Sequence, residues 1–288
     1  YNIADDQCLS IDSQFADLFI SGSGSITDFV EDLQDVTTRR ELPSIYPDTR
    51  DELIHGRYDL DLLMHDSRGL LSFAFPGLYI ADGTRATMSI SKDGELVGNA
   101  TSSRLAIGTT FIKDADLQFD NLGESLSISL IGQNFRSGKF DLDRPDISLL
   151  AKDDTISASL RFDSFSLSGG SGEIYAEGEF WRDSTNTLVI KARPLESYIS
   201  AGNGVWDIGE SDVMVRDGDI YVKDFRISNR DQVISVDGGI SRERDDTLFL
   251  GISRLDLAQA DDFLPRSYGI RGVANGKAML TSRSGRAK

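Results

Sequence analysis

Alternation of apolar and polar residues is the feature that most constrains what this chain can fold into. Residues 156–163 read Ile-Ser-Ala-Ser-Leu-Arg-Phe-Asp, and residues 126–130 read Leu-Ser-Ile-Ser-Leu. Because successive side chains of a strand point to opposite faces of a sheet, each such run has one apolar face and one polar face. About fifteen runs of this kind follow one another, each near the usual strand length of roughly five to six residues. The pattern predicts an all-β protein.

Turn residues between the runs indicate how the strands are connected. Asp-Gly pairs occur at 93–94 and 217–218, each between two apolar runs. Asp-Gly tolerates positive φ and suits two-residue hairpin turns, so the strands are expected to form antiparallel meanders rather than βαβ units. The apolar face must then be covered. A sandwich, a barrel, pairing with another sheet, or a curled groove that presents the face to an apolar ligand all satisfy this requirement.

One segment near the N-terminus carries a helical pattern instead. Four apolar residues recur at helical spacing: Ile26, Phe29, Val30 and Leu33. Ser25 precedes them and is suited to cap the helix. We expect a short helix whose apolar stripe lies along the apolar face of the sheet or closes one end of a groove. A shorter helical turn is expected at 258–263, before Pro265.

Composition excludes several classes of function. The chain has 30 basic and 47 acidic residues, so its formal net charge is −17. This charge argues against nucleic-acid binding and against electrostatic docking on anionic lipid. One cysteine permits neither an intrachain disulfide nor a Cys-based zinc site. The longest uncharged apolar stretch, 69–81, is shorter than the roughly 20 residues that a membrane-spanning helix needs.

Abundant carboxylates offer candidate sites that the pattern does not support. Asp59 and Asp61, or Asp141, Asp143 and Asp146, are conceivable calcium ligands or glycosidase acids. No complete calcium-binding loop is present, and alternation places Asp59 and Asp61 on one solvated strand face. We therefore expect no catalytic residues, no metal site and no cofactor. A carbohydrate-active β enzyme that uses an Asp/Glu pair is the less favoured alternative.

The C-terminal part of the sequence resembles a known family. Residues 229–238 read Asn-Arg-Asp-Gln-Val-Ile-Ser-Val-Asp-Gly, followed by Asp-Thr-Leu at 246–248, Leu-Asp-Leu at 255–257 and glycines at 269, 272 and 276. This order is similar to modules of the TamB branch of the AsmA-like envelope proteins of diderm bacteria. The resemblance extends over 204–282. Residues 1–203 share only the texture of Ser-rich alternating strands.

The resemblance implies a function and a location. In TamB-like proteins, a long β-sheet is curled into a trough with an apolar interior. These proteins are anchored in the inner membrane and cross the periplasm toward an outer-membrane barrel partner (TamA-like). They are linked to phospholipid transport between the two membranes and to outer-membrane protein assembly. The resemblance carries over no catalytic residue. Anchor and partner contact are expected to involve segments outside this chain.

Together these observations predict a non-enzymatic, hydrophobic conduit for phospholipid acyl chains. The expected fold is a long antiparallel sheet curled into a trough with one or two short helices. It is divided into an N-terminal segment with the helix (1–57), a groove segment (58–203) and a TamB-like module (204–288). The alternative is a closed β-sandwich binding or scaffold module without a lipid channel. The candidate groove residues are Leu117, Phe119, Leu126, Ile128, Leu130, Ile156, Leu160, Phe162, Leu188, Ile190, Ile220, Val222, Ile234, Val236, Leu248 and Leu250.

Overall fold

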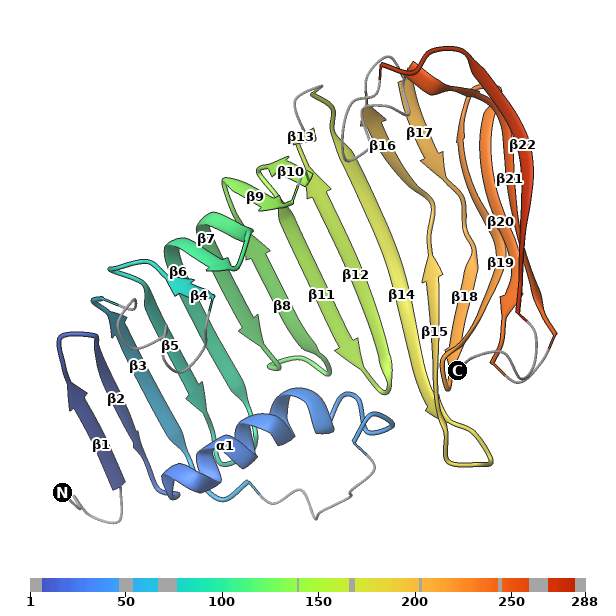
Figure 1. Cartoon of the computed structure of the whole chain (residues 1–288). Coiled ribbons are helices and arrows are strands. Elements are labelled where there is room, and N and C mark those ends of the chain that lie inside the picture. The colour runs from blue at the N-terminus through green and yellow to red at the C-terminus, as the bar shows by residue number, and fades with distance from the viewer. Residues whose placement is uncertain are drawn as a thin grey trace. The chain divides into compact units, whose positions relative to one another are not determined.

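The computed structural model describes residues 7–46, 54–66, 77–138, 140–165, 169–201, 204–242, 245–258 and 269–282. The chain divides into two compact units, Tyr1–Asp154 and Thr155–Lys288. In both, the described residues form mostly antiparallel strands, so the predicted all-β class is confirmed (Figure 1). The trough and the division into 1–57, 58–203 and 204–288 stay predictions. No helix of the described residues is long and apolar enough to cross a membrane.

The first unit is built on one long antiparallel ladder with the order β1–β2–β3–β5–β6–β7–β8–β11. A shorter ladder, β4–β6–β7–β9–β10, shares two of its strands. The elements are β1 (Gln7–Asp12), β2 (Ala16–Gly22), α1 (Ile26–Gln34), the π-helical turn η1 (Asp35–Arg39), β3 (Tyr58–Met64), β4 (Leu78–Ile80), β5 (Arg85–Ile90), β6 (Leu96–Ile107), β7 (Thr110–Asp120), β8 (Leu126–Ile131), β9 (Asn134–Ser137), β10 (Phe140–Asp143) and β11 (Asp146–Lys152).

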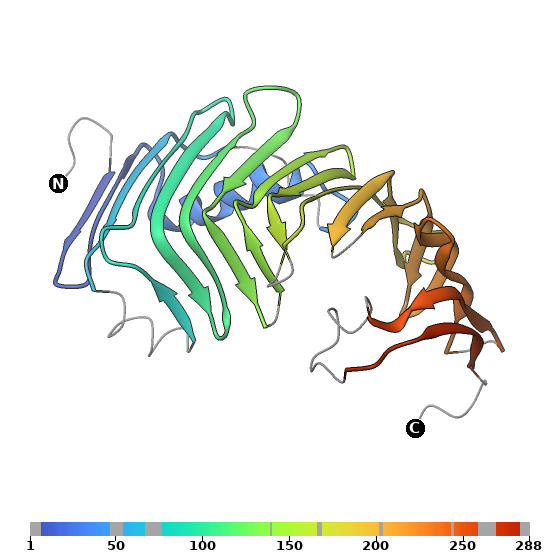
Figure 2. The same cartoon turned by 90° about the horizontal axis from the view of Figure 1, so that it is seen from above.

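Strands β6 and β7 bend where they pass from one ladder to the other. Residues 96–101 of β6 pair with β5, whereas residues 105–107 pair with β4. In the pairing of β6 with β7, the facing residues Ser103 and Asp114 are both skipped without a register shift, and Asp114 has a left-handed φ of 47°. The ladder is interrupted at this point. Figure 2 shows the bend in the long strands of the first unit.

The second unit repeats this arrangement. Its long ladder has the order β12–β14–β15–β18–β19–β20–β21–β22, and β16 and β17 link β14 to β19. Register shifts fall at Asp224 in β19 and Arg254 in β21, with φ of 58° and 50°. The strands are β12 (Thr155–Phe162), β13 (Ser164–Phe165), β14 (Gly172–Arg182), β15 (Leu188–Pro194), β16 (Ser197–Ala201), β17 (Gly204–Ile208), β18 (Asp212–Arg216), β19 (Asp219–Asn229), β20 (Gln232–Ile240), β21 (Thr247–Asp256) and β22 (Val273–Thr281).

Helix α1 begins where the sequence predicts but presents a different face to the sheet. The Ser25 Oγ accepts a bond from the Asp28 backbone N–H (3.2 Å), and the Ser25 N–H donates to Asp28 Oδ2 (3.1 Å), which forms a capping box. Phe29 is buried as expected. Ile26 and Val30 are 42% and 53% exposed, so their predicted place in the buried stripe is wrong.

Asp32 takes the place of the missing apolar residues on the buried face of α1. Its side chain is 0% exposed. It accepts hydrogen bonds from the backbone N–H of His55 (2.9 Å) and of Gly56 (3.3 Å). The buried face of α1 is therefore the one that carries Phe29 and Asp32. The helical turn expected at 258–263 lies outside the described residues except for Ala258.

Candidate functional site

Each unit presents one apolar face of its long ladder, and the strand register defines it. Directly paired residues of an antiparallel sheet lie on the same face. In the first unit, one row across the ladder, here called the middle row, consists of Leu9, Ile20, Leu60, Met88, Gly98, Phe119, Ile128 and Leu149. The next row on this face is Ile11, Leu18, Leu62, Ala86, Ala100, Leu117, Leu130 and Ile147.

The opposite face of the same strands is predominantly polar. The row behind the middle row reads Ser10, Phe19, Asp61, Thr87, Asn99, Gln118, Ser129 and Ser148. Phe19, 45% exposed, is its single large apolar member. The alternation seen in the sequence is therefore converted into two chemically distinct faces that extend across the ladder.

Burial on the apolar face of the first unit is uneven. A row near α1 is fully buried, with Tyr58 at 2% and Ile90 and Leu96 at 0% exposure. The ring of Phe29 lies edge-on to that of Tyr58, with centroids 5.3 Å apart, so the helix covers this end of the face (Figure 1).

At the other end of the strands, beside the bend, Met64 and Ala115 are also buried. The rows between the two ends are not closed off in this way. Five residues of the middle row are half-buried, namely Leu9, Leu60, Met88, Phe119 and Ile128, whereas Ile20 is 8% and Leu149 36% exposed.

The candidate residues of the first unit all lie on this face. Leu117, Phe119, Ile128 and Leu130 belong to the two open rows and are half-buried. Leu126 pairs with Ala151 one row closer to the buried end, and is 6% exposed. The five residues thus share one face, but Leu126 lies in the closed part of the unit, and their role as a groove stays a prediction.

The second unit brings its eleven candidates to one face in the same manner. A row crosses it through Ile156, Gly178, Ala192, Val213, Val222, Gly238 and Leu248. Nine candidates are half-buried: Ile156, Leu160, Leu188, Ile190, Val222, Ile234, Val236, Leu248 and Leu250. Phe162 is buried and Ile220 is 42% exposed.

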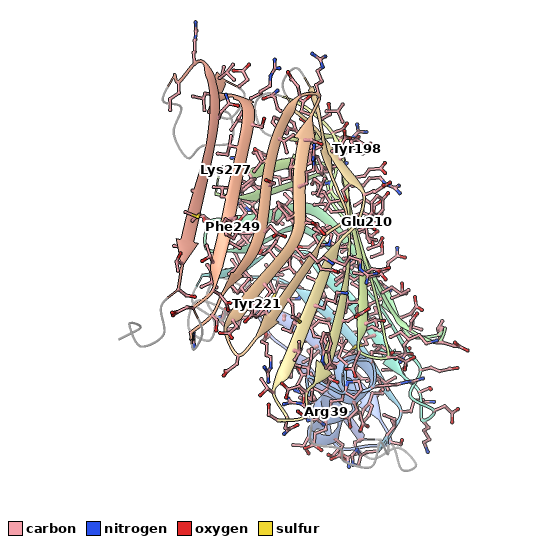
Figure 3. All side chains as sticks on the ribbon, turned by 90° about the vertical axis from the view of Figure 1, so that its right-hand side faces the viewer. Arg39, Tyr198, Glu210, Tyr221, Phe249 and Lys277 are labelled. Carbon is pink, nitrogen blue, oxygen red and sulfur yellow. The ribbon has the colours of Figure 1, made fainter. Side chains whose placement is uncertain are left out.

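Charged and polar side chains occupy the reverse of the second unit. Lys191 Nζ lies 3.1 Å from Asp212 Oδ1, and this contact holds the pKa of Asp212 below its usual range. A hollow of about 570 Å³ lies beside this pair, with Met214 and Tyr221 in its lining. Tyr221, Phe249 and Lys277, labelled in Figure 3, belong to this polar face by their strand register. Most residues that line the hollow belong to the polar face, but Val222 and Gly238 of the apolar-face row also border it.

Sequence reasoning missed a polar cluster where α1 meets the sheet. His55 Nδ1 lies 2.7 Å from Asp32 Oδ1, and this hydrogen bond raises the pKa of His55. Burial raises the pKa of the nearby Tyr58 phenol, and the negative charge of Asp32 adds to this effect. No sequence signal marked Asp32, because an acidic residue in a short helix is ordinarily solvated.

The carboxylates considered as catalytic or calcium-binding groups take ordinary roles. Asp59 and Asp61 are exposed on the polar face. Asp141 forms an ion pair with Arg136. Within the described residues, no group of three or more His, Cys, Asp or Glu is arranged to hold a metal ion.

Comparisons with known proteins add no identification. No family model matches this chain, and neither the curated proteins nor the solved structures include a match.

Proposed function

We propose that this chain is a non-enzymatic, TamB-like envelope segment whose apolar faces carry phospholipid acyl chains between the inner and outer membranes. The observation that supports this most is that most residues of the middle row and of the row beside it are half-buried, although Ile20 and Gly98 are buried and Leu149 and Ile11 are exposed. A residue in a closed protein core is normally excluded from water. A band of apolar side chains that has buried rows on both sides of it, toward the two ends of the strands, and is half-open between them is suited to an apolar ligand.

The dimensions of the middle row agree with an acyl chain. The row crosses eight strands, and seven spacings of ~4.8 Å give a length of about 34 Å. One leaflet of a bilayer contributes about 15 Å of hydrocarbon, half of the ~30 Å core. A chain lying along the row would have every methylene against protein, and each buried methylene contributes about 0.8 kcal/mol.

The polar reverse face explains how such a segment remains compatible with water. The chain has a net charge of −17, and Ser, Asp and Lys side chains lie on the reverse face. In this proposal one face of the sheet binds the ligand and the other face is solvated. In this proposal the periplasm is the location, and the inner-membrane anchor and the contact with a barrel partner lie outside this chain. A contribution to outer-membrane protein assembly belongs to the same proposal.

Photo-crosslinking tests the proposal at matched positions. A benzophenone amino acid at Ile128 or at Leu160 is placed on the apolar face, and the same residue at Ser129 or at Arg161 is placed on the polar face. Purified protein is irradiated with phosphatidylglycerol and analysed by mass spectrometry. The proposal expects lipid adducts at Ile128 and Leu160 and none at the other two. Equal labelling at all four, or labelling at none, would favour a closed scaffold module.

A further inference from the structure

Four aromatic residues of the sheets lie directly opposite glycines. Tyr58 pairs with Gly22, Phe119 with Gly98, Phe162 with Gly172 and Tyr221 with Gly239. At each of these glycines, a Cβ atom would lie less than 3.0 Å from the partner ring. The rings therefore extend sideways over the neighbouring strand and cover the glycine, as in aromatic rescue of glycine in sheets.

Of these four pairs, we consider Gly98 and Phe119, because this pair lies in the middle row of the apolar face. Both Gly98 and Phe119 belong to the middle row, in which Phe119 is half-buried and Gly98 is buried. A Cβ atom on Gly98 would lie 2.1 Å from Cζ of Phe119 and 2.5 Å from Cε2. The outer edge of the ring thus occupies the place that a side chain would take at residue 98.

We propose that the Gly98–Phe119 pair sets the free depth of the apolar face and thereby decides whether an acyl chain can pass along the middle row. The proposal rests on the function proposed above. With glycine at 98, the ring lies along the sheet and forms part of its floor. With any larger residue, the ring is forced away from the floor. The sheet backbone blocks movement downward, so the ring rises into the space that the chain would use.

Gly98 also offers the cleanest substitution of the four. The three nearest atoms to a Cβ at this position all belong to the flexible Phe119 ring. At Gly22 and Gly172 the backbone oxygens of Arg57 and Tyr198 would lie 2.1 and 2.9 Å away, so those substitutions disturb the fold itself. Gly98→Ala therefore isolates the position of the ring.

Gly178→Ala is the matched control. Gly178 lies on the apolar face of the second unit, between Ile156 and Ala192. A Cβ there would meet its nearest neighbour, Cε2 of Phe180, at 3.6 Å, an ordinary contact. The control thus adds the same methyl group to the same kind of face without displacing a ring.

The experiment measures binding of 11-(dansylamino)undecanoic acid, a fluorescent fatty acid, to the full chain. Gly98→Ala is expected to weaken binding about tenfold, as when roughly two methylene groups lose their contacts. Gly178→Ala is expected to bind as the wild type does. The double variant Gly98→Ala/Phe119→Leu should recover most of the affinity, because the shorter side chain leaves the floor clear.

A structural measurement accompanies binding. A fluorine label at Cζ of Phe119 reports whether the ring moves, and its ¹⁹F resonance should shift and gain solvent exposure in Gly98→Ala. If wild type binds and Gly98→Ala binds equally well, the inference is overturned while the proposed function stands. If wild type binds no fatty acid and the crosslinkers at Ile128 and Leu160 capture no lipid, the proposed function fails, and the inference fails with it.

Discussion

Removing the buried carboxylate of Asp32 should destabilise the first unit selectively. The side chain is 0% exposed and accepts hydrogen bonds from two backbone N–H groups, those of His55 and Gly56. Asp32→Ala leaves both donors without a partner, at about 1–3 kcal/mol each, and admission of water to the vacated space reduces the total. We expect a loss of about 2–4 kcal/mol in the free energy of unfolding of the first unit.

Asp35→Ala, in the π-helical turn η1 that directly follows α1, is the control. Asp35 forms an i,i+4 ion pair with Arg39 at 2.6 Å, and the two side chains are 13% and 28% exposed. Such pairs contribute about 0.5 kcal/mol. The two aspartates lie three residues apart, so a large difference between their alanine variants would reflect burial and backbone hydrogen bonds rather than helix charge.

Hydrogen exchange measured by mass spectrometry is the appropriate assay, because it resolves peptides of each unit. Both tryptophans of the chain, Trp181 and Trp206, belong to the second unit, so their fluorescence during urea unfolding serves as an internal reference. In Asp32→Ala, protection of peptides that span Tyr58 and Ile90 should fall, and the tryptophan transition should stay unchanged. A variant whose first unit stays within about 0.5 kcal/mol of wild type would refute the role assigned to Asp32.

Three further outcomes follow from the same packing. Phe29→Ala removes a buried ring and should lower the free energy of unfolding of the first unit by about 3–5 kcal/mol, measured by hydrogen exchange. Unchanged hydrogen-exchange protection would mean that the helix is peripheral. His55 has a pKa raised by Asp32, so its contribution to stability is full below its unfolded pKa and is lost as the pH rises through its folded pKa; NMR titration should show this pKa return toward its usual value in Asp32→Asn. Leu160→Asp and Ile128→Asp should leave a folded protein with reduced lipid binding, because half-buried side chains can reach solvent; circular dichroism of an unfolded chain would contradict this.

Local periodicity in the sequence was sufficient to predict strands and faces. Leu126, Ile128 and Leu130 alternate with serines, and the structure places the three on one face of β8. A period of two specifies by geometry alone to which face of the sheet each side chain points. The face can therefore be predicted without knowing the partner strand. The N-terminal end of α1 was equally local, since Ser25 and Asp28 form their capping box within one turn.

What escaped prediction depends on partners far apart in the sequence. The ladder irregularities at Asp114, Asp224 and Arg254 occur at left-handed residues that are not glycine, inside strands β7, β19 and β21. Asp32 is buried only because residues 55 and 56 donate to it across more than twenty positions of chain. The pairing of Gly98 with Phe119 likewise requires the register of β6 against β7, which alternation leaves open.

The central claim is that the half-open apolar rows hold acyl chains, and crosslinking to phosphatidylglycerol tests it most directly. Ile128 and Ser129 are adjacent in β8 but lie on opposite faces of the sheet. A benzophenone at Ile128 is predicted to yield a covalent lipid adduct, and the same group at Ser129 is predicted to yield none. Absence of an adduct at Ile128 in a folded protein, or equal adducts at both positions, would contradict the account.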